Sequence, residues 1–358
     1  MFEPYGKEGL YIAGPECFYG RGYELWWAQR KLAEYHGVPV VLPTSTELKL
    51  DATDPKLNAK EIFDDLIVQV ARTTSIIADL EFFRGCEPDG GTVFELGWVW
   101  AKKGRLYGYS RDLRPMSVKN QNARLEDGVL LDQNGWRHPY GDLPFCPSLV
   151  GSTRLVEGDF ADALKVYLMD LDEERKGNSM NRALSMRSII IAGAGPVVYL
   201  SGPERYSPDA LRFYKDAKEL CGKLGYSAVC PLDEVEEMPA PDTEDPYTLA
   251  AWRFRKSMAL LAASDIVVAN LADFHGWEPN NDVSFECGVA YGLGKRCVGY
   301  MPDTSIMRRR IPHYGEEKGN LDWCGNAVEN FDHPINLMFA CSMPIFEGPL
   351  EKVLQENL

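Results

Sequence analysis

The sequence predicts two tandem α/β domains, each a doubly wound, flavodoxin- or Rossmann-like parallel sheet with helices on both faces. Three observations support this fold class. The chain has 358 residues, more than a single hydrophobic core usually organises. Short apolar runs such as SIIADL and DIVVANL alternate with helix-length amphipathic stretches, a pattern typical of parallel strands joined by helical crossovers. The chain also repeats itself, which predicts that the two domains share one fold.

The repeat relates the two halves of the chain. Residues 10–18, LYIAGPECF, recur as VYLSGPERY at 198–206; each copy is an apolar run that breaks at Gly-Pro and enters a helical segment. Residues 76–109 match residues 267–300 without a gap, at a constant spacing of 191. The identical pairs include Phe83 with Phe274, Gly85 with Gly276, Glu95 with Glu286 and Gly97 with Gly288. We infer a tandem duplication and expect the two copies to form a pseudo-homodimer.

The boundary between the copies is marked by a change in composition. The segment LKVYLMDLDEERKGNSMNRALSMRS predicts a terminal helix followed by a polar linker. We therefore assign residues 1–178 to the first domain, 179–196 to the linker and 197–358 to the second domain. Gly193 and Gly195 form a GxG that precedes its strand, so the context of a dinucleotide-binding loop is missing and the glycines belong to the linker.

Composition excludes several classes of function. The net charge of -15 repels nucleic acid polymers and acidic membranes, which favours a small ligand. The nine cysteines form no CxxC pair and the five histidines no HExxH, so we expect neither a metal site nor a cofactor. The N-terminus lacks the basic and apolar stretches of a signal peptide, and no apolar run reaches membrane length. We expect a cytoplasmic protein.

The candidate site is the segment PDGGTVFELG at 88–97. It follows the predicted strand at 76–80 and precedes a helix, at the sheet edge where such folds bind ligands. Two glycines allow a small molecule to approach the backbone, and two carboxylates, Asp89 and Glu95, flank the turn. Cleavage of a glycosidic bond requires such a pair, because one carboxylate attacks or stabilises the anomeric carbon while the other handles the proton of the leaving group.

A structural alternative for Glu95 is a capping box. In TVFE, Glu95 would bond back to the helix start beside Thr92. The second half has Val283-Ser284-Phe285-Glu286 at this place, so the capping Thr is lost while the glutamate is kept. That difference favours a role for the glutamate other than capping.

These motifs resemble those of the nucleoside 2'-deoxyribosyltransferases, over almost the whole chain and twice. The shared features are a YLAGP-like opening, an F-R-G turn, D-x-G-T-x-x-E-x-G and a late N-L-M. The resemblance implies that Glu95 is the nucleophile, that Asp89 handles the proton of the base, and that Tyr11 holds the nucleophile. It places Phe18 close to the base, although Tyr and Phe at strand ends are usually core residues.

The same resemblance implies further substrate contacts from the opening, the third strand and the F-R-G turn: Gly14, Asp79, Arg84 and Gly85. Asp65 corresponds to a base-contacting acidic residue on the preceding helix; a solvated helix face is the alternative for it.

The two halves depart from the family pattern in complementary ways. Only the second half has the N-L-M, which begins at Asn336; the first half has PYGDLPFCPSLVGS in this region. The resemblance implies that this asparagine reaches across a subunit interface to the deoxyribose of the neighbouring site. The second half keeps Glu286 and Tyr199 but has Asn280 in place of Asp89, and Asp282 lies two positions out of register. An amide cannot exchange a proton as a carboxylate does. We therefore predict one composite site per chain, with Asn336 completing the first domain, and a degenerate second site.

The resemblance implies an enzyme of nucleoside salvage that transfers 2-deoxyribose between nucleobases through an ester on Glu95. Its substrates would be deoxynucleosides and free bases, with purines favoured by the F-R-G turn and D-x-G-T loop. Three alternatives remain open: a hydrolase of deoxynucleosides or their 5'-monophosphates, a phosphoribohydrolase of the cytokinin type, whose PGGxGTxxE has different glycine spacing, and a non-catalytic nucleoside sensor. The fused pair could stand alone or form a homo-oligomer.

Overall fold

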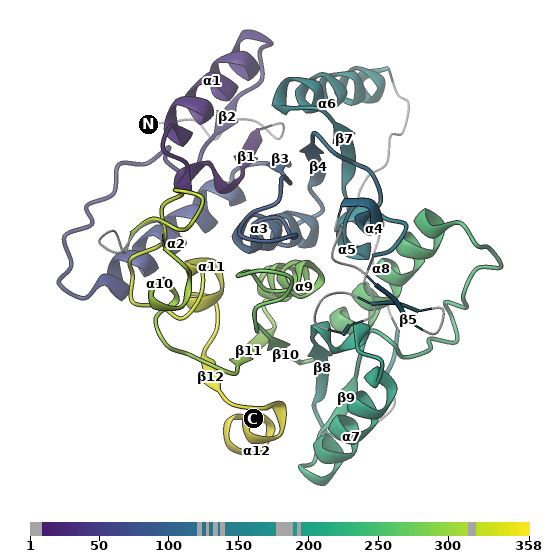
Figure 1. Cartoon of the computed structure of the whole chain (residues 1–358). Coiled ribbons are helices and arrows are strands. Elements are labelled where there is room, and N and C mark those ends of the chain that lie inside the picture. Colours follow the sequence, from purple (N-terminus) through teal and green to yellow (C-terminus); the bar gives the residue numbers. More distant parts are fainter. Residues whose placement is uncertain are drawn as a thin grey trace.

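The computed structural model has two five-stranded parallel sheets, which confirms the predicted fold class. It describes residues 9–119, 124–126, 129–131, 135–136, 140–176, 189–191, 195–313 and 320–358. The first sheet has the strand order β2-β1-β3-β4-β7 and the second the order β12-β11-β10-β8-β9, which is the same order related by the duplication. In Figure 1 the sheets lie on opposite sides of a central helical layer.

The first half builds its sheet from residues 10–157. Its strands are β1 (Leu10–Ala13), β2 (Val40–Val41), β3 (Ser75–Asp79), β4 (Arg105–Ser110) and β7 (Arg154–Glu157). The outer face carries α1 (Gly22–Tyr35) and α6 (Phe160–Arg175), and the inner face carries α2 (Pro55–Ala71), α3 (Gly90–Ala101) and α5 (Pro147–Ser152). A short 3-10 helix, η1 (Pro15–Phe18), follows β1, and α4 (Met116–Lys119) and the hairpin of β5 (Arg124–Glu126) and β6 (Val129–Leu131) follow β4.

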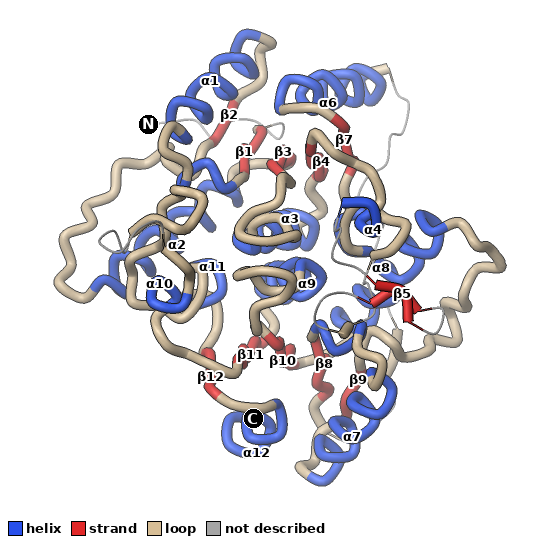
Figure 2. Tube along the Cα trace, viewed as in Figure 1, coloured by secondary structure: helices blue, strands red, loops and turns tan. Residues whose placement is uncertain are grey.

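The second half repeats this plan. Its strands are β8 (Val197–Ser201), β9 (Ser227–Val229), β10 (Ile266–Asn270), β11 (Arg296–Met301) and β12 (Ile345–Glu347). Helices α7 (Ala210–Lys223) and α12 (Leu350–Asn357) lie outside, whereas α8 (Pro246–Ala262), α9 (Asn281–Gly292) and α11 (Leu337–Ala340) lie inside. The 3-10 helix η2 (Pro203–Tyr206) follows β8, and α10 (Met307–Arg310) follows β11 (Figure 2). Most of the proposed linker lies outside the described residues, so its bounds stay a prediction.

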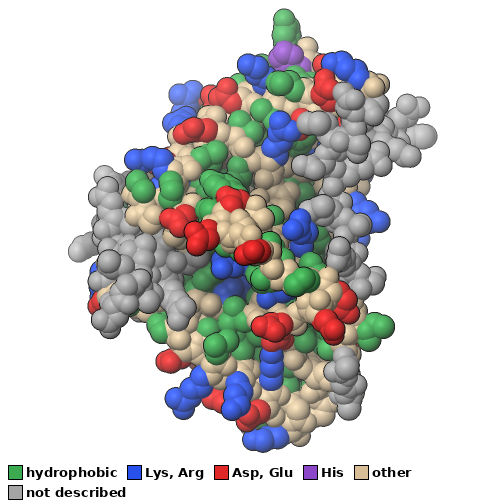
Figure 3. Space-filling model, turned by 90° about the vertical axis from the view of Figure 1, so that its right-hand side faces the viewer, with side chains coloured by type: hydrophobic (Ala, Val, Ile, Leu, Met, Phe, Trp, Pro, Cys, Tyr) green, Lys and Arg blue, Asp and Glu red, His purple; other side chains and the backbone are tan. Residues whose placement is uncertain are grey.

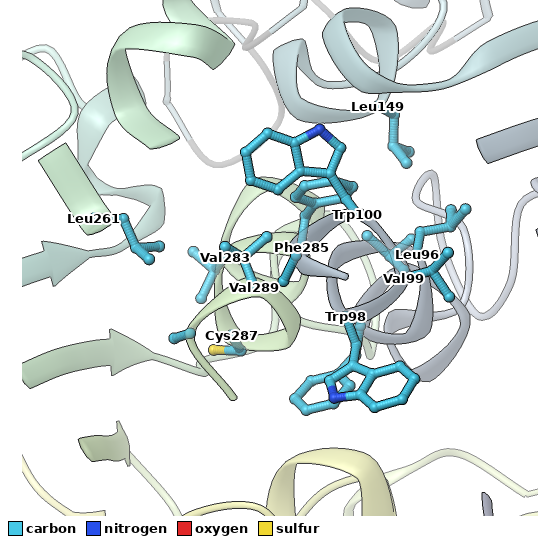
Figure 4. Close-up of a cluster of buried hydrophobic side chains, with 14 of the residues drawn as sticks. Leu96, Trp98, Val99, Trp100, Leu149, Leu261, Val283, Phe285, Cys287 and Val289 are labelled. Atoms are coloured by element: carbon cyan, nitrogen blue, oxygen red, sulfur yellow. The ribbon is translucent and has the colours of Figure 1, made fainter. Parts of the chain in front are cut away.

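The two halves share one hydrophobic core, centred on α3 and α9. Side chains of both helices, among them Trp100 and Phe285, interleave there with residues from α5 and α8 (Figure 4). Two glycines related by the repeat let the helix backbones touch: a Cβ on Gly97 would collide with the carbonyl oxygen of Phe285, and a Cβ on Gly288 with that of Phe94. The duplication is therefore preserved as a pseudo-twofold contact between the halves.

We expect Gly97→Ala to destabilise the protein. The added methyl group has no space between the helix backbones, so α3 and α9 must separate, and overpacking of this kind costs about 1–3 kcal/mol. Gly222→Ala is the matched control, because nothing lies within 4 Å of that position on the exposed side of α7. The free energy of unfolding of this control variant should increase by about 0.4–1 kcal/mol. Denaturant unfolding measures both, and equal stability of the two variants would contradict the tight contact.

A second pseudo-symmetric contact lies beside the candidate site. Gly85 pairs with Gly276 in an antiparallel bridge between the halves. The buried glutamates that follow these turns exchange partners: Glu278 accepts a hydrogen bond from the backbone N–H of Gly90 (3.2 Å), and Glu87 accepts one from that of Asn281 (3.2 Å). Each half thereby holds the start of the other half's central helix.

The last inner helix of each half also crosses the interface. Helix α5 of the first half packs against α8 and α9, and α11 of the second half packs against α2 and α3. This exchange brings residues near 330–338 to the carboxyl edge of the first sheet. The outer surface is mixed in character: acidic, basic and hydrophobic side chains are interspersed on the face shown in Figure 3.

Candidate active site

A cavity of about 340 Å³ lies where the two halves meet at the carboxyl edge of the first sheet. The first half contributes the loop after β1, parts of α1 and α2, and the start of α3. The second half contributes residues 327–331 and 336–338. Candidate residues from both halves line it: Gly14, Phe18, Asp89, Glu95 and Asn336.

Glu95 lies in the second turn of α3 and is 7% exposed. The hydroxyl of Tyr11, on the buried strand β1, donates a hydrogen bond to Glu95 Oε1 at 2.7 Å. Burial raises the pKa of Glu95 to about 8; the Tyr11 hydrogen bond lowers it, and the nearby charges of Asp89 and Glu16 raise it. The capping-box alternative is wrong, because the helix begins after Asp89 and the Glu95 side chain bonds to Tyr11.

Asp89 is the N-cap of α3. Its Oδ2 accepts hydrogen bonds from the backbone N–H and the hydroxyl of Thr92, both at 2.7 Å. Its other oxygen, Oδ1, is buried without a hydrogen-bond partner. Burial raises the pKa of this carboxyl. Thr92 thus holds one oxygen and leaves the other for a group in the cavity.

Asn336 is the N-cap of α11. Its Oδ1 accepts the backbone N–H of Met338 at 2.9 Å, so Nδ2 is the atom left to donate to a ligand. The amide lies against the start of α3: a Cβ on Gly91 would be 2.9 Å from both amide atoms. The close approach of Asn336 to the Asp89–Glu95 turn therefore depends on glycine at position 91.

The other predicted residues divide between the cavity and its supports. The ring of Phe18 stacks on Phe83 with centroids 5.3 Å apart. Arg84 is buried outside the cavity lining, where its Nε lies 3.1 Å from Asp322 Oδ2 and its Nη2 donates to the carbonyl of Ala327 at 2.6 Å. It therefore fixes the second half's loop, and Gly85 beside it serves the bridge between the halves.

Asp79 and Asp65 also lie outside the cavity lining. Asp79 ends β3 and accepts the backbone N–H of Glu81 at 2.8 Å; burial and the neighbouring Glu16 raise its pKa to about 7. Asp65 is half-buried on α2, with one oxygen bonded to Gln69 at 3.2 Å and the other buried without a partner. The solvated helix face considered for Asp65 is wrong, because one carboxylate oxygen is buried and the other accepts a hydrogen bond from Gln69.

Comparison with known proteins identifies the family. The model of the nucleoside 2-deoxyribosyltransferase family matches residues 10–143 and again residues 198–338, more than half of the chain. The chain belongs to this family. No curated protein matches the sequence.

Three solved structures are similar to one half of this family member. A 2-desoxiribosyltransferase from Leishmania mexicana is 23% identical, with a TM-score of 0.36, covering 46% of this chain and 100% of its own. A 2-deoxyribosyltransferase from Bacillus psychrosaccharolyticus is 20% identical, with a TM-score of 0.28 and coverage of 45% and 93%. A conserved protein from Enterococcus faecalis V583 is 22% identical, with a TM-score of 0.28 and coverage of 46% and 97%.

In the second half of this deoxyribosyltransferase-family chain, the equivalent glutamate is enclosed by protein groups. Glu286 is 0% exposed and accepts hydrogen bonds from Tyr199 (2.8 Å), Ser201 (2.6 Å) and both terminal nitrogens of Arg205 (2.8 and 2.6 Å). By the repeat, Arg205 replaces Cys17, which lines the first cavity. An arginine thus takes the place beside the glutamate that is open in the first half.

The other polar groups of the second half are also occupied. Asn280 donates to the hydroxyl of Tyr140 at 2.6 Å. Asp282 accepts the backbone N–H and hydroxyl of Ser148, at 2.9 and 2.6 Å, and the hydroxyl of Tyr206. Asp282 therefore anchors α5. The residue at the place of Asn336 is Cys146, the N-cap of α5.

The residues of the family member's cavity that the sequence did not reveal include Cys17 and Glu329. Cys17 could have been found by comparing the copies, since the first copy has a small residue at the position where the second copy has an arginine. Glu329 gave no such signal, because its side chain reaches the cavity through the fold of a long loop.

Among the described residues, no helix is long and apolar enough to span a membrane. The same residues hold no group of three or more His, Cys, Asp or Glu side chains arranged for a metal ion.

Proposed function

We propose that this protein transfers 2-deoxyribose between nucleobases at the cavity of its first half. The observation that carries the proposal is the convergence of Glu95, Asp89 and Asn336 on one cavity, from two halves of the chain. Glu95 would be the nucleophile, Asp89 the proton donor and acceptor, and Asn336 the contact to deoxyribose. The second half would supply residues to this site and hold no active site of its own.

In the first step, a Glu95 oxygen attacks C1' of the deoxynucleoside as the N-glycosidic bond breaks. The departing base nitrogen takes the bonding electron pair and the proton of Asp89, leaving a deoxyribosyl ester on Glu95. An incoming base then attacks C1', returns its proton to the Asp89 carboxylate and releases Glu95. The unpartnered Oδ1 of Asp89 supports this assignment, because a proton-transfer oxygen must be free to meet the substrate.

The cavity favours uncharged nucleosides over their phosphates. Among the described residues that line it, the Asp and Glu side chains are Asp89, Glu95 and Glu329. A 5'-phosphate would be repelled by the ionised Glu95 and would find no arginine or lysine in that lining. This argues against the monophosphate hydrolase, and we retain the preference for purines from the sequence motifs.

The experiment is to incubate the purified protein with deoxyinosine, with and without adenine, and to separate the products by chromatography. Deoxyadenosine formed only when adenine is added would establish base exchange. Hypoxanthine released equally fast without adenine would identify a hydrolase. Turnover restricted to deoxyinosine 5'-monophosphate would contradict the charge argument, and tight binding without any turnover would identify a sensor.

The pH dependence tests the roles of Tyr11 and Glu95. Glu95 must be ionised to attack, and its pKa is raised to about 8, so kcat/KM should fall as the pH decreases through 8. Tyr11→Phe removes the hydrogen bond that lowers this pKa. The acidic limb should move up by about one unit, with about a tenfold loss of kcat/KM at pH 7.

Tyr199→Phe is the matched control, since Tyr199 makes the same hydrogen bond to Glu286 in the second half. Its pH profile should match that of the unaltered protein. An acidic limb that stays in place in Tyr11→Phe would show that Tyr11 does not tune the nucleophile.

A further inference from the structure

Glu329 is a third carboxyl in the cavity, supplied by the second half. It lies in a loop that is tied to the first half, because Ala327 donates its backbone N–H to the carbonyl of Phe18 at 2.7 Å. Its Oε2 accepts the backbone N–H of Leu337 at 2.9 Å. The loop is also braced by Asp322, which accepts the N–H groups of Cys324 and Asn326, both at 2.9 Å. The carboxyl of Glu329 is therefore held in a fixed position.

Three carboxyls in a cavity of about 340 Å³ cannot all be ionised. Arg84 is the nearby cation, but its guanidinium is paired with Asp322 (3.1 Å) and Glu278 (3.6 Å). The proposed reaction requires Glu95 as an anion and Asp89 as an acid. Glu329 is then most stable as a neutral carboxylic acid.

The groups around Glu329 agree with this assignment. Burial raises its pKa to about 8; the Leu337 N–H and Arg84 lower it, and Asp89 raises it. Within the described part of the chain, the other titratable groups that interact electrostatically with Glu329 are Cys17 from η1, Glu278 from the interface turn and Cys341 from the end of α11.

The position of Glu329 points to the base end of a bound nucleoside. The carboxyl of Glu329 is bonded to the N–H of Leu337, and the preceding residue, Asn336, lies against Gly91 beside Asp89. Glu329 therefore lies on the Asp89 side of the cavity. The anomeric carbon must approach Glu95 and the base must approach Asp89, so Glu329 faces the base.

We propose that Glu329 recognises the nucleobase by hydrogen-bonding, as a neutral carboxylic acid, to a base edge that presents an acceptor beside a donor. The hydroxyl of the acid donates to a ring nitrogen while its carbonyl accepts from an exocyclic amine, as on adenine. An ionised carboxylate offers only acceptors and would repel the ring nitrogen. This inference rests on the proposed function and adds a specificity-determining residue to it.

The test compares adenine binding by the full-length protein and Glu329→Gln, by calorimetry at pH 6.5 and pH 9. Glutamine keeps a donor, an acceptor and the bond to Leu337, but does not titrate. The readout is the ratio of the adenine dissociation constant of the unaltered protein to that of the variant. This ratio should rise about tenfold from pH 6.5 to pH 9, because about nine-tenths of Glu329 is ionised at the higher pH. Glu95, whose pKa of about 8 lies in the same window, titrates in both proteins, so its effect divides out of this ratio.

Glu351→Gln, on the exposed side of α12, makes the same chemical change far from the cavity and should leave the dissociation constant unchanged. A second readout is the preference for adenine over unsubstituted purine, which lacks the amine. Glu329→Ala should lower that preference about tenfold.

A ratio that stays constant with pH, or an unaltered preference in Glu329→Ala, would overturn the inference and leave Glu329 as an anchor for Leu337. If base exchange proceeds in that case, the proposed function stands without it. If the unaltered protein binds no base at either pH, both fail together.

Discussion

Glu95→Gln should abolish base exchange, with a loss on the order of 10⁴-fold or more in kcat. Glutamine has the shape of glutamate and can still accept the hydrogen bond from Tyr11, so α3 and the cavity should be retained. Its amide oxygen is too weak a nucleophile to form an ester with deoxyribose. Product chromatography after long incubation measures the residual rate, and mass spectrometry of trapped enzyme should detect the ester only when Glu95 is present.

Glu286→Gln is the repeat-matched control and should retain exchange per folded molecule. It leaves Arg205 buried without its anionic partner, which costs about 3–5 kcal/mol of stability. The rate must therefore be normalised to the folded fraction, measured by circular dichroism. Loss of exchange in the folded Glu286 variant, or its survival in Glu95→Gln, would reverse the assignment of the active half.

Cys17→Arg should close the first site by copying the second. By the repeat, an arginine at position 17 occupies the place of Arg205, whose two terminal nitrogens bind Glu286 at 2.8 and 2.6 Å. The guanidinium would pair with both oxygens of Glu95 and fill space that the substrate needs. We expect a loss of exchange on the order of 10³-fold, from a blocked nucleophile and an occupied cavity.

Cys17→Ser separates this blockage from the loss of the thiol and should retain exchange. Arg205→Cys is the reciprocal change, and it should create no second activity, because Asn280 and Cys146 stand at the positions that correspond to Asp89 and Asn336. Near-normal exchange in a folded Cys17→Arg protein would show that Glu95 does not react in this cavity.

The fold was predictable because the strands and the repeat are local patterns. The apolar run SIIADL forms β3 in the structure. Residues that match at the constant spacing of 191, such as Gly97 and Gly288, lie at equivalent positions in the contact of α3 with α9. The sequence does not predict which residues of α3 and α9 touch, because nothing local distinguishes Gly97 from the many other glycines of the chain. Its role follows from a collision with Phe285, which exists only when the halves are packed.

The residues of the cavity were predicted best where they lie within one local motif. Asp89 and Glu95 were found from the turn that holds them, and both line the cavity. Arg84 and Gly85 were expected to contact substrate, yet they join the two halves. A sequence motif shows that a side chain is present but does not show in which direction it points. The partners of Asp282 and Arg205 likewise come from distant segments.

The sequence by itself determined the duplication, the fold of each copy, the family and the pair of carboxylates, because these depend on composition, periodicity and short-range spacing. Only the tertiary structure decided which groups share the cavity. In the folded chain, Asn336 and Glu329 of the second half line the cavity of the first half, and Arg205 pairs with Glu286. Packing of α11 against α2 and α3 is the physical reason for the contribution of Asn336 and Glu329, since it brings residues some 240 positions apart within contact distance. The pair of Arg205 and Glu286 forms within the second half, between η2 and α9.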